Sequence, residues 1–285
     1  RYPLRRQRQM CIRDSHQRYY HANTVTLWVQ GPQPIAALWS LAQQAAEAFP
    51  AGVALPPALP ALTPAAECDI ALQLTGAPRL RLSFLLNQRI DGGLTVLRQL
   101  LLDEAAGSLM ATLREQALCD AARLLLPYCS AQQTVIALEL VLVDAGDADR
   151  AEACVHRWLA QLGRLTPAQR AHYAQLASRR FAQLPVMDQL RERAFGFAPA
   201  GDDEGAILFP LLSAAPLSRL WIADSTPLDQ LEVQGWTLAC QPGVRAPVQP
   251  DTSGEAFVFF PHPLPPAIPT LPVRQAMPVS YTHLT

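Results

Sequence analysis

Lysine is absent from this sequence: all 23 basic residues are arginine, and 24 acidic residues bring the net charge to −1. A nearly neutral chain argues against a nucleic-acid-binding protein, which normally carries a basic face. The sequence also lacks any run of about 18 apolar residues, so it predicts no transmembrane helix, and no apolar stretch typical of a secretory signal lies near its N-terminus. We therefore expect no nucleic-acid or membrane partner, and a cytoplasmic location.

Paired metal-binding cysteines are absent as well. Six cysteines are scattered along the chain without a C-x-x-C pair, which argues against a zinc ribbon and against a small disulfide scaffold. Free thiols in a reducing compartment are the simpler explanation. The 285 residues, of which 50% are hydrophobic and 16% charged, predict a folded protein of one large or two ordinary domains.

Both ends of the chain resemble translations of sequencing-adapter DNA, over residues 6–15 and 278–285. We therefore expect residues 1–15 to be an adapter-derived tail. Residues 263–285 are expected to form a Pro-rich tail that ends in adapter-derived residues. The alternative at the N-terminus is a genuine basic tail.

The first part of the remaining chain is predicted to contain a strand, a helix and a linker. Apolar and polar residues alternate over residues 25–29, which is typical of a strand packed on one face. Pro34 suits the first turn of a helix that runs to Phe49. Residues 50–65 are rich in proline, which sustains neither a helix nor a central strand, and are the predicted linker.

Residues 66–262 are predicted to form an α+β domain. The order strand–strand–helix–helix occurs twice in succession along this part of the chain, which implies a mostly antiparallel sheet with helices packed on one face. The expected elements are strands near 70–74 and 80–84, helices near 97–101 and 109–113, and strands near 124–130 and 134–143. They are followed by a helix that is capped by Asp147 or Asp149 and ends at Gly163, and by a helix near 167–184.

Several residues sharpen these assignments. Gly107 is free to take a positive φ, as residues that end helices commonly do, and Ser108 is a predicted N-cap of the next helix. Pro127 should confine its strand to a sheet edge or a bulge. Residues 134–143 are apolar on both faces, which predicts a central strand. Thr166 begins a capping box.

Beyond residue 200 the pattern weakens. Residues 201–205 are expected to form an acidic loop, residues 217–221 and 227–231 short helices, and residues 256–260 a last strand. Residues 261–272 are too rich in proline for regular structure.

Two stretches of the chain resemble a known family. Residues 98–119 read RQLLLDEAAGSLMATLREQALC, and this pattern resembles the second-domain signature of the insulinase/pitrilysin family of zinc metallopeptidases. Residues 16–32, HQRYYHANTVTLWVQGP, are similar to the close of the first domain in that family. The resemblance implies that residues 16–49 are the strand–helix end of a first peptidase-like domain and residues 66–262 the second.

The catalytic motif of that family is missing. It requires H-x-x-E-H on a helix, where two histidines bind zinc and the glutamate activates a water molecule. None of the six histidines lies in such a motif, so we assign no catalytic or metal-binding residue and expect zinc to bind outside this fragment. Glu152 and His156 could offer two ligands at i and i+4, but a surface ion pair is the favoured interpretation.

Two places are candidate substrate-binding sites. Asp103 and Glu104 could form a paired-carboxylate site, but a solvated helix end is the favoured interpretation. The family resemblance implies that these two residues border a surface that holds the N-terminal part of a substrate. The resemblance also implies that residues 124–130 form an edge strand to which an extended peptide adds. The candidate residues there are Leu125, Leu126, Pro127 and Tyr128. The family often has glycines at this edge, and Pro127 removes one donor.

Residues 187–199, MDQLRERAFGFAP, are similar to a subgroup that acts in pyrroloquinoline quinone (PQQ) biosynthesis. The resemblance therefore implies that the intact protein is a zinc metalloendopeptidase that processes a small precursor peptide, with this part supplying chamber wall and substrate docking. The implied partners are the peptide substrate and the missing domains of the same protein or a homologous subunit. The alternatives are a non-catalytic homologue that binds peptides or partners, and an unrelated α+β domain.

Overall fold

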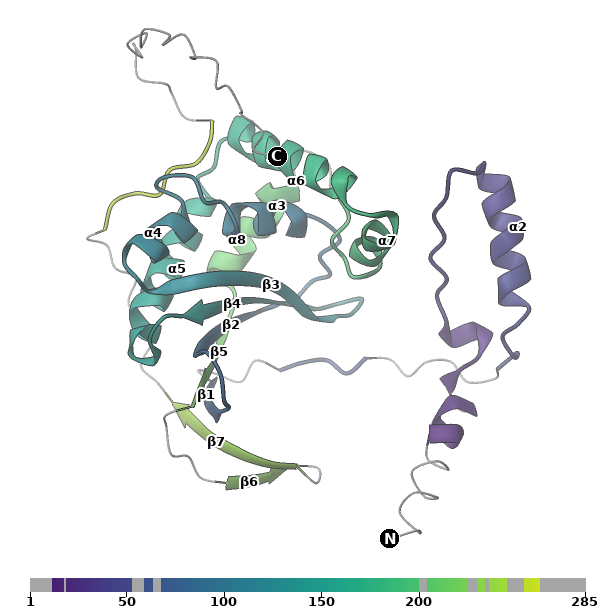
Figure 1. Ribbon diagram of the computed structural model, residues 1–285, viewed down its shortest axis with the longest axis horizontal. Helices are drawn as coiled ribbons and strands as arrows, with labels where there is room; N and C mark the ends of the chain where they lie inside the picture. Colours follow the sequence, from purple (N-terminus) through teal and green to yellow (C-terminus); the bar gives the residue numbers. More distant parts are fainter. Residues whose placement is uncertain are drawn as a thin grey trace, which may run out of the picture.

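The structure is a computed structural model that describes residues 12–17, 19–52, 59–63, 68–199, 204–224, 230–233, 236–244 and 254–261. Its main body is one sheet covered by helices, and a separate N-terminal segment carries helix α2 (Ile35–Ala46; Figure 1). Most of the predicted adapter-derived residues and the whole tail 263–285 lie outside the described residues. Within the described residues, no helix combines the length and hydropathy needed to cross a membrane.

The sheet has seven strands in the order β3-β4-β2-β5-β1-β7-β6. Strands β1 (Cys68–Gln73) and β5 (Leu217–Ala223) are parallel, and all other neighbours are antiparallel. The remaining strands are β2 (Arg79–Leu86), β3 (Cys119–Cys129), β4 (Thr134–Leu142), β6 (Gln230–Val233) and β7 (Trp236–Val244). The predicted α+β class with a mostly antiparallel sheet is confirmed.

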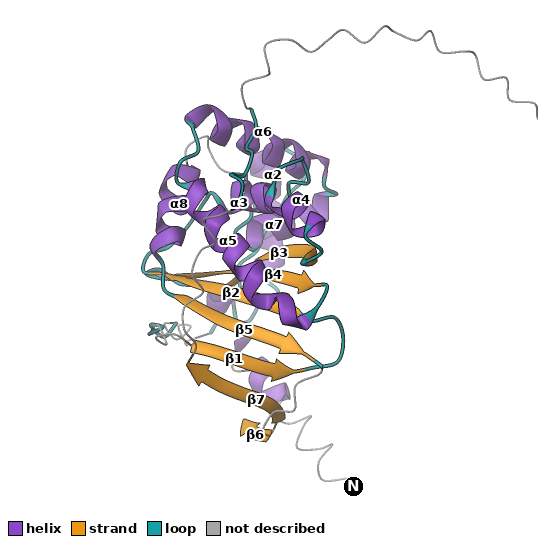
Figure 2. Cartoon of the chain, turned by 90° about the vertical axis from the view of Figure 1, so that its left-hand side faces the viewer, coloured by secondary structure: helices purple, strands orange, loops and turns teal. Residues whose placement is uncertain are grey.

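Helices cover one face of this sheet (Figure 2). Helices α3, α5 and α8 contact its strands, and α6 packs on the outside of α3. The helices of the main body are α3 (Leu94–Leu101), α4 (Leu109–Glu115), α5 (Ala148–Leu162), α6 (Pro167–Gln183), α7 (Val186–Ala194) and α8 (Glu204–Ala214). The other face of the sheet carries no helix of the main body within the part of the chain that the structure describes.

The core lies between the sheet and these helices because both present continuous apolar faces. The alternation in β2 places Leu80, Leu82 and Phe84 at 0–2% exposure, and Leu97 of α3 and Trp158 of α5 are fully buried in the same cluster. Burial of each such side chain stabilises the fold by about 1.5–3 kcal/mol.

The turn between α3 and α4 differs from the prediction. Helix α3 already ends at Leu101, so Gly107 does not end it, although Gly107 does take a positive φ of 79°. The carboxylate of Asp103 instead accepts the N–H of Ala105 at 3.0 Å and holds the turn. The prediction for Ser108 is confirmed, since its hydroxyl accepts the N–H of Ala111 at 3.2 Å.

The other helix and strand signals are mostly confirmed. The capping box of Thr166 and Gln169 begins α6, and β4 is an interior strand between β3 and β2. Helix α5 begins after Asp147, but that side chain makes no cap hydrogen bond and pairs with Arg150 at 2.7 Å.

Several further predictions of local structure are wrong. Residues 25–29 are not a strand, because no described strand pairs with them. Residues 217–221 belong to β5, and residues 230–231 to β6, rather than to helices; residues 227–229 lie outside the described residues. Glu204 and Gly205 begin α8 instead of continuing a loop, and residues 201–203 are not described.

The predicted last strand is instead an irregular strap across the helices. Residues 254–261 contain no strand. The N–H of Phe257 donates to Gln161 at 2.9 Å, and the N–H of Val258 donates to the carbonyl of Gly107 at 2.9 Å. Of the proline-rich residues 261–272, only Pro261 is described.

Candidate peptide-binding edge

Strand β3 forms one edge of the sheet. It pairs with β4, and no other described strand pairs with its outer side. The N–H of Leu142 in β4 donates toward β2, to the carbonyl of Pro78 at 2.9 Å. Successive residues of an antiparallel strand direct their backbone N–H and carbonyl groups to opposite sides. The backbone groups of Glu139, three residues before Leu142, therefore point to β3, where the partner residue is Arg123. The backbone groups of the residues on either side, Ala122 and Leu124, therefore point to the open edge.

The side chains of Ala122 and Leu124 stand roughly perpendicular to the sheet, on its helix-covered face, and are buried. Burial anchors this part of β3 while leaving its outer backbone groups without a strand partner. The arrangement can accept an extended peptide as an additional strand.

The far end of β3 is closed by two features. The register with β4 shifts between Leu125 and Tyr128, so the sequence prediction that Pro127 lies at an edge or a bulge is confirmed on both counts. The hydroxyl of Tyr128 donates to the carbonyl of Pro60. Gln133, just past β3, bonds the N–H and the carbonyl of Leu62 at 2.7 and 2.9 Å. The described linker residues 59–63 thus cover this end of the strand.

The four candidate residues of β3 therefore have different surroundings. Leu125 is paired with Ala137 of β4, and Leu126 packs against the core. Pro127 is exposed within the bulge, and Tyr128 holds the linker. The section with outward backbone groups lies just before these residues, at Ala122 and Leu124.

Asp103 and Glu104 do not come together as a carboxylate pair. Asp103 accepts the hydroxyl of Tyr173 at 2.7 Å, while Glu104 pairs with Arg114 at 2.8 Å. Burial, together with the hydrogen bond to Asp103, raises the pKa of Tyr173 well above its usual range, so this hydroxyl remains a donor. Glu104 does reach the start of β3, since both line one cavity of about 320 Å³. No pattern in the sequence indicates that Arg114 and Arg180 line the same cavity.

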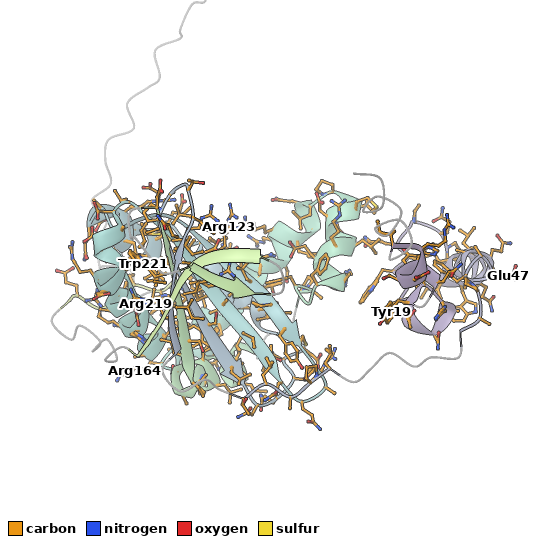
Figure 3. The ribbon with its side chains drawn as sticks, turned by 90° about the horizontal axis from the view of Figure 1, so that it is seen from below. Tyr19, Glu47, Arg123, Arg164, Arg219 and Trp221 are labelled. Carbon is orange, nitrogen blue, oxygen red and sulfur yellow. The ribbon has the colours of Figure 1, made fainter. Side chains whose placement is uncertain are left out.

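The Nε2 of His156 lies 3.5 Å from the carboxylate of Glu152, so the two form an ion pair when the histidine is protonated. The carboxylate is not at the surface, however: its side chain is 5% exposed and lies 3.1 Å from Arg219 of β5. Arg219 points from the sheet toward the helices (Figure 3).

Among the described residues, no group of three or more His, Cys, Asp and Glu side chains could hold a metal ion. The described part of the chain therefore does not fit a zinc ion.

The helix-free face of the sheet carries a row of charges. Arg123, Glu139 and Arg81 lie opposite one another on β3, β4 and β2. The Nε of Arg81 lies 3.0 Å from the buried carboxylate of Glu139, while Arg123 is exposed (Figure 3). This row has one positive charge in excess.

Comparison with solved structures defines the class of fold. The chain is similar to the crystal structure of pitrilysin, with a TM-score of 0.58 and 16% identity over 82% of this chain and 28% of that one. It is also similar to a peptidase M16 inactive domain from Pseudomonas fluorescens, with a TM-score of 0.50 and 16% identity over 73% of this chain and 55% of that one. The fold is that of an M16 peptidase domain.

Sequence comparison defines the family. Residues 78–220 match the family model described as PQQ synthase PqqF, N-terminal lobe domain 2, and the chain belongs to this family. It is 35% identical over 255 residues to "Coenzyme PQQ synthesis protein F" of Klebsiella pneumoniae, covering 89% of this chain and 32% of the relative. Identity to the protein of the same name from Pseudomonas aeruginosa is 37% over 160 residues, or 54% of this chain and 20% of the relative. The chain thus spans about a third or less of these relatives, and the insulinase/pitrilysin resemblance is confirmed.

Proposed function

We propose that the intact protein is a zinc metalloendopeptidase that processes a small precursor peptide in PQQ biosynthesis, and that this chain docks the peptide and forms part of the chamber wall. Membership of a family named for PQQ synthesis supports the pathway. The single observation that carries the docking role is the open section of β3, where Ala122 and Leu124 direct backbone groups away from β4.

Docking along β3 needs only main-chain chemistry. Ala122 and Leu124 together offer two N–H donors and two carbonyl acceptors to an extended peptide. Each hydrogen bond contributes a net free energy of only about 0.5–1.5 kcal/mol. The edge therefore holds one part of a peptide weakly, which suits a site that positions a substrate for cleavage elsewhere.

Zinc would supply Lewis-acid chemistry and an activated water molecule in the intact protein. The H-x-x-E-H motif is absent from the sequence, and the described residues offer no donor set for the metal. We therefore propose that zinc is held by a part of the protein outside this chain.

The proposed chamber wall is the helix-free face of the sheet, with its row of Arg123, Glu139 and Arg81. The proposed partners of this chain are the peptide and the remaining domains of the same protein or a homologous subunit. Exposed apolar residues in residues 16–49 support the proposal that this segment completes a first domain. Cys119, Cys129 and Cys154 form no disulfide with any cysteine that the structure describes, which is in keeping with a cytoplasmic location.

The test uses the full-length protein and the precursor peptide. Cleavage should require zinc and stop when a chelator removes it. Ala122→Pro deletes an N–H that points to the open edge and spares the ladder with β4. We expect KM to rise roughly two- to tenfold, the equivalent of one hydrogen bond, with little change in kcat.

Ala131→Pro is the matched control. Ala131 follows Ser130 in the β3–β4 turn, its φ is not positive, and its N–H donates no hydrogen bond to a residue that the structure describes, so proline removes no contact there. This variant should keep the KM of the unmodified protein. Absence of any zinc-dependent cleavage would contradict the enzymatic proposal and favour the non-catalytic homologue.

A further inference from the structure

The cavity of about 320 Å³ opens directly beside the open section of β3. Ala121 and Ala122 form its strand side, and the backbone groups of Ala122 are those that would pair with a docked peptide. The α3–α4 turn, α4 and the end of α6 supply the other walls. A side chain of a peptide bound along β3 would therefore have this cavity next to it.

The cavity combines an apolar part with a charged rim. Leu102 and the buried Met110 provide the apolar part. Glu104, Arg114 and Arg180 provide the charges. The rim therefore has one positive charge in excess.

The excess charge belongs to Arg180. Glu104 neutralises Arg114, whose Nη1 lies 2.8 Å from its carboxylate, and Arg114 also donates to the backbone carbonyl of Asp120 at 3.2 Å. Arg180 is exposed at the end of α6 and makes no ion pair or side-chain hydrogen bond with any residue that the structure describes. Its guanidinium is therefore available to a ligand.

We propose that this cavity is a specificity pocket for an acidic side chain of the docked peptide. A glutamate fits both parts of the pocket: its methylene groups would lie on Leu102 and Met110, and its carboxylate would accept hydrogen bonds from Arg180, whose planar group suits bidentate binding. A basic side chain would meet the repulsion of Arg180. This inference rests on the proposed docking of peptides along β3.

The test measures binding of two peptides to the full 285-residue chain by fluorescence anisotropy. Both are extended peptides of alternating valine and threonine, with a single central glutamate in one and glutamine in the other. Because exposed ion pairs are weak, we expect the glutamate peptide to bind up to about fivefold more tightly at low salt. The preference should shrink as salt is raised to about 0.5 M.

Three variants locate the preference. Arg180→Gln should abolish it, and Arg180→Glu should reverse it in favour of the glutamine peptide. Arg179→Glu is the matched control, because Arg179 is an exposed neighbour on the same helix that does not line the cavity. It should retain the preference for glutamate.

The outcomes separate this inference from the docking proposal. If both peptides bind equally, or if Arg179→Glu acts like Arg180→Glu, peptides still dock but the acidic pocket is refuted. If neither peptide binds the unmodified chain, docking along β3 is itself refuted, and the pocket with it.

Discussion

Trp39 and Trp158 both lie on helices with apolar faces, yet their surroundings are opposite. Trp158 of α5 is fully buried between the sheet and the helices. Trp39 of α2 (Ile35–Ala46) is 65% exposed, and no residue of that helix is buried. The segment that carries Tyr19 and Glu47 lies to one side of the sheet domain (Figure 3), and its Gln30 side chain donates to that of Gln189 in α7 at 3.1 Å. An apolar helix face is thus buried only where a partner surface exists, and no described part of the chain supplies such a surface for α2.

Substituting each tryptophan in turn should give the largest difference in unfolding free energy between the two regions. Trp158→Ala should lower the free energy of unfolding by about 3–5 kcal/mol, because it leaves a cavity in the core. Trp39→Ala should change it by less than about 0.5 kcal/mol, as exposed substitutions do. Urea unfolding followed by far-UV circular dichroism measures both. Equal losses would show that α2 is part of the same folding unit.

Within the sheet domain, a buried ion pair can be compared with an exposed one. Arg219→Ala should lower the free energy of unfolding by about 3 kcal/mol, because it leaves the Glu152 carboxylate buried without its guanidinium partner. Arg191→Ala is the control, since Arg191 pairs with Asp188 at the exposed surface, and it should cost at most about 1 kcal/mol. The same unfolding measurement applies, and similar losses would contradict the burial argument.

The Gly107 turn gives a smaller effect. A Cβ on Gly107 would lie 2.6 Å from Val258 of the strap, and its φ is positive, so Gly107→Ala should cost about 1–3 kcal/mol. Gly163→Ala is the control, because nothing lies within 4 Å of its Cβ position and its conformation is helical. That change should be neutral or slightly stabilising. A loss at Gly163 as large as at Gly107 would remove the strap from the explanation.

The smallest expected effect is a pH dependence that also resides in the sheet domain. Burial raises the pKa of the Cys119 thiol from 9.0 to about 11. Between these values the unfolded chain has lost the thiol proton and the folded chain has kept it, so the free energy of unfolding falls as pH rises. Cys119→Ala should reduce that fall. An unchanged slope in this variant would refute the assignment to Cys119.

Much of the sheet domain could be predicted because its signals are local. The alternation of Leu80, Leu82 and Phe84, the cap at Ser108 and the capping box at Thr166 each depend on neighbouring residues alone, and all are confirmed. The errors lie where the outcome depends on distant partners. Residues 25–29 alternate like a strand but have no strand to pair with, and residues 217–221 form a strand because β1 and β2 flank them.

The candidate site follows the same division. The missing N–H of Pro127 is a local property, and it is enough to predict that its strand lies at a sheet edge or contains a bulge. The open backbone groups at Ala122 and Leu124 follow from the register with β4, which no local pattern reveals. Arg180 reaches the cavity from the end of α6, far along the chain. The family resemblance predicted residues 124–130 as an edge strand, and the outward backbone groups at Ala122 and Leu124 overlap only the start of that range.

Residue-resolved amide hydrogen exchange, with and without the glutamate peptide, tests the open edge most directly. We predict that the amides of Ala122 and Leu124 exchange rapidly in the free chain and slow down when the peptide binds. The amide of Arg123, which faces β4, should be protected in both states. Unchanged exchange at Ala122 and Leu124 in the presence of bound peptide would contradict docking along β3.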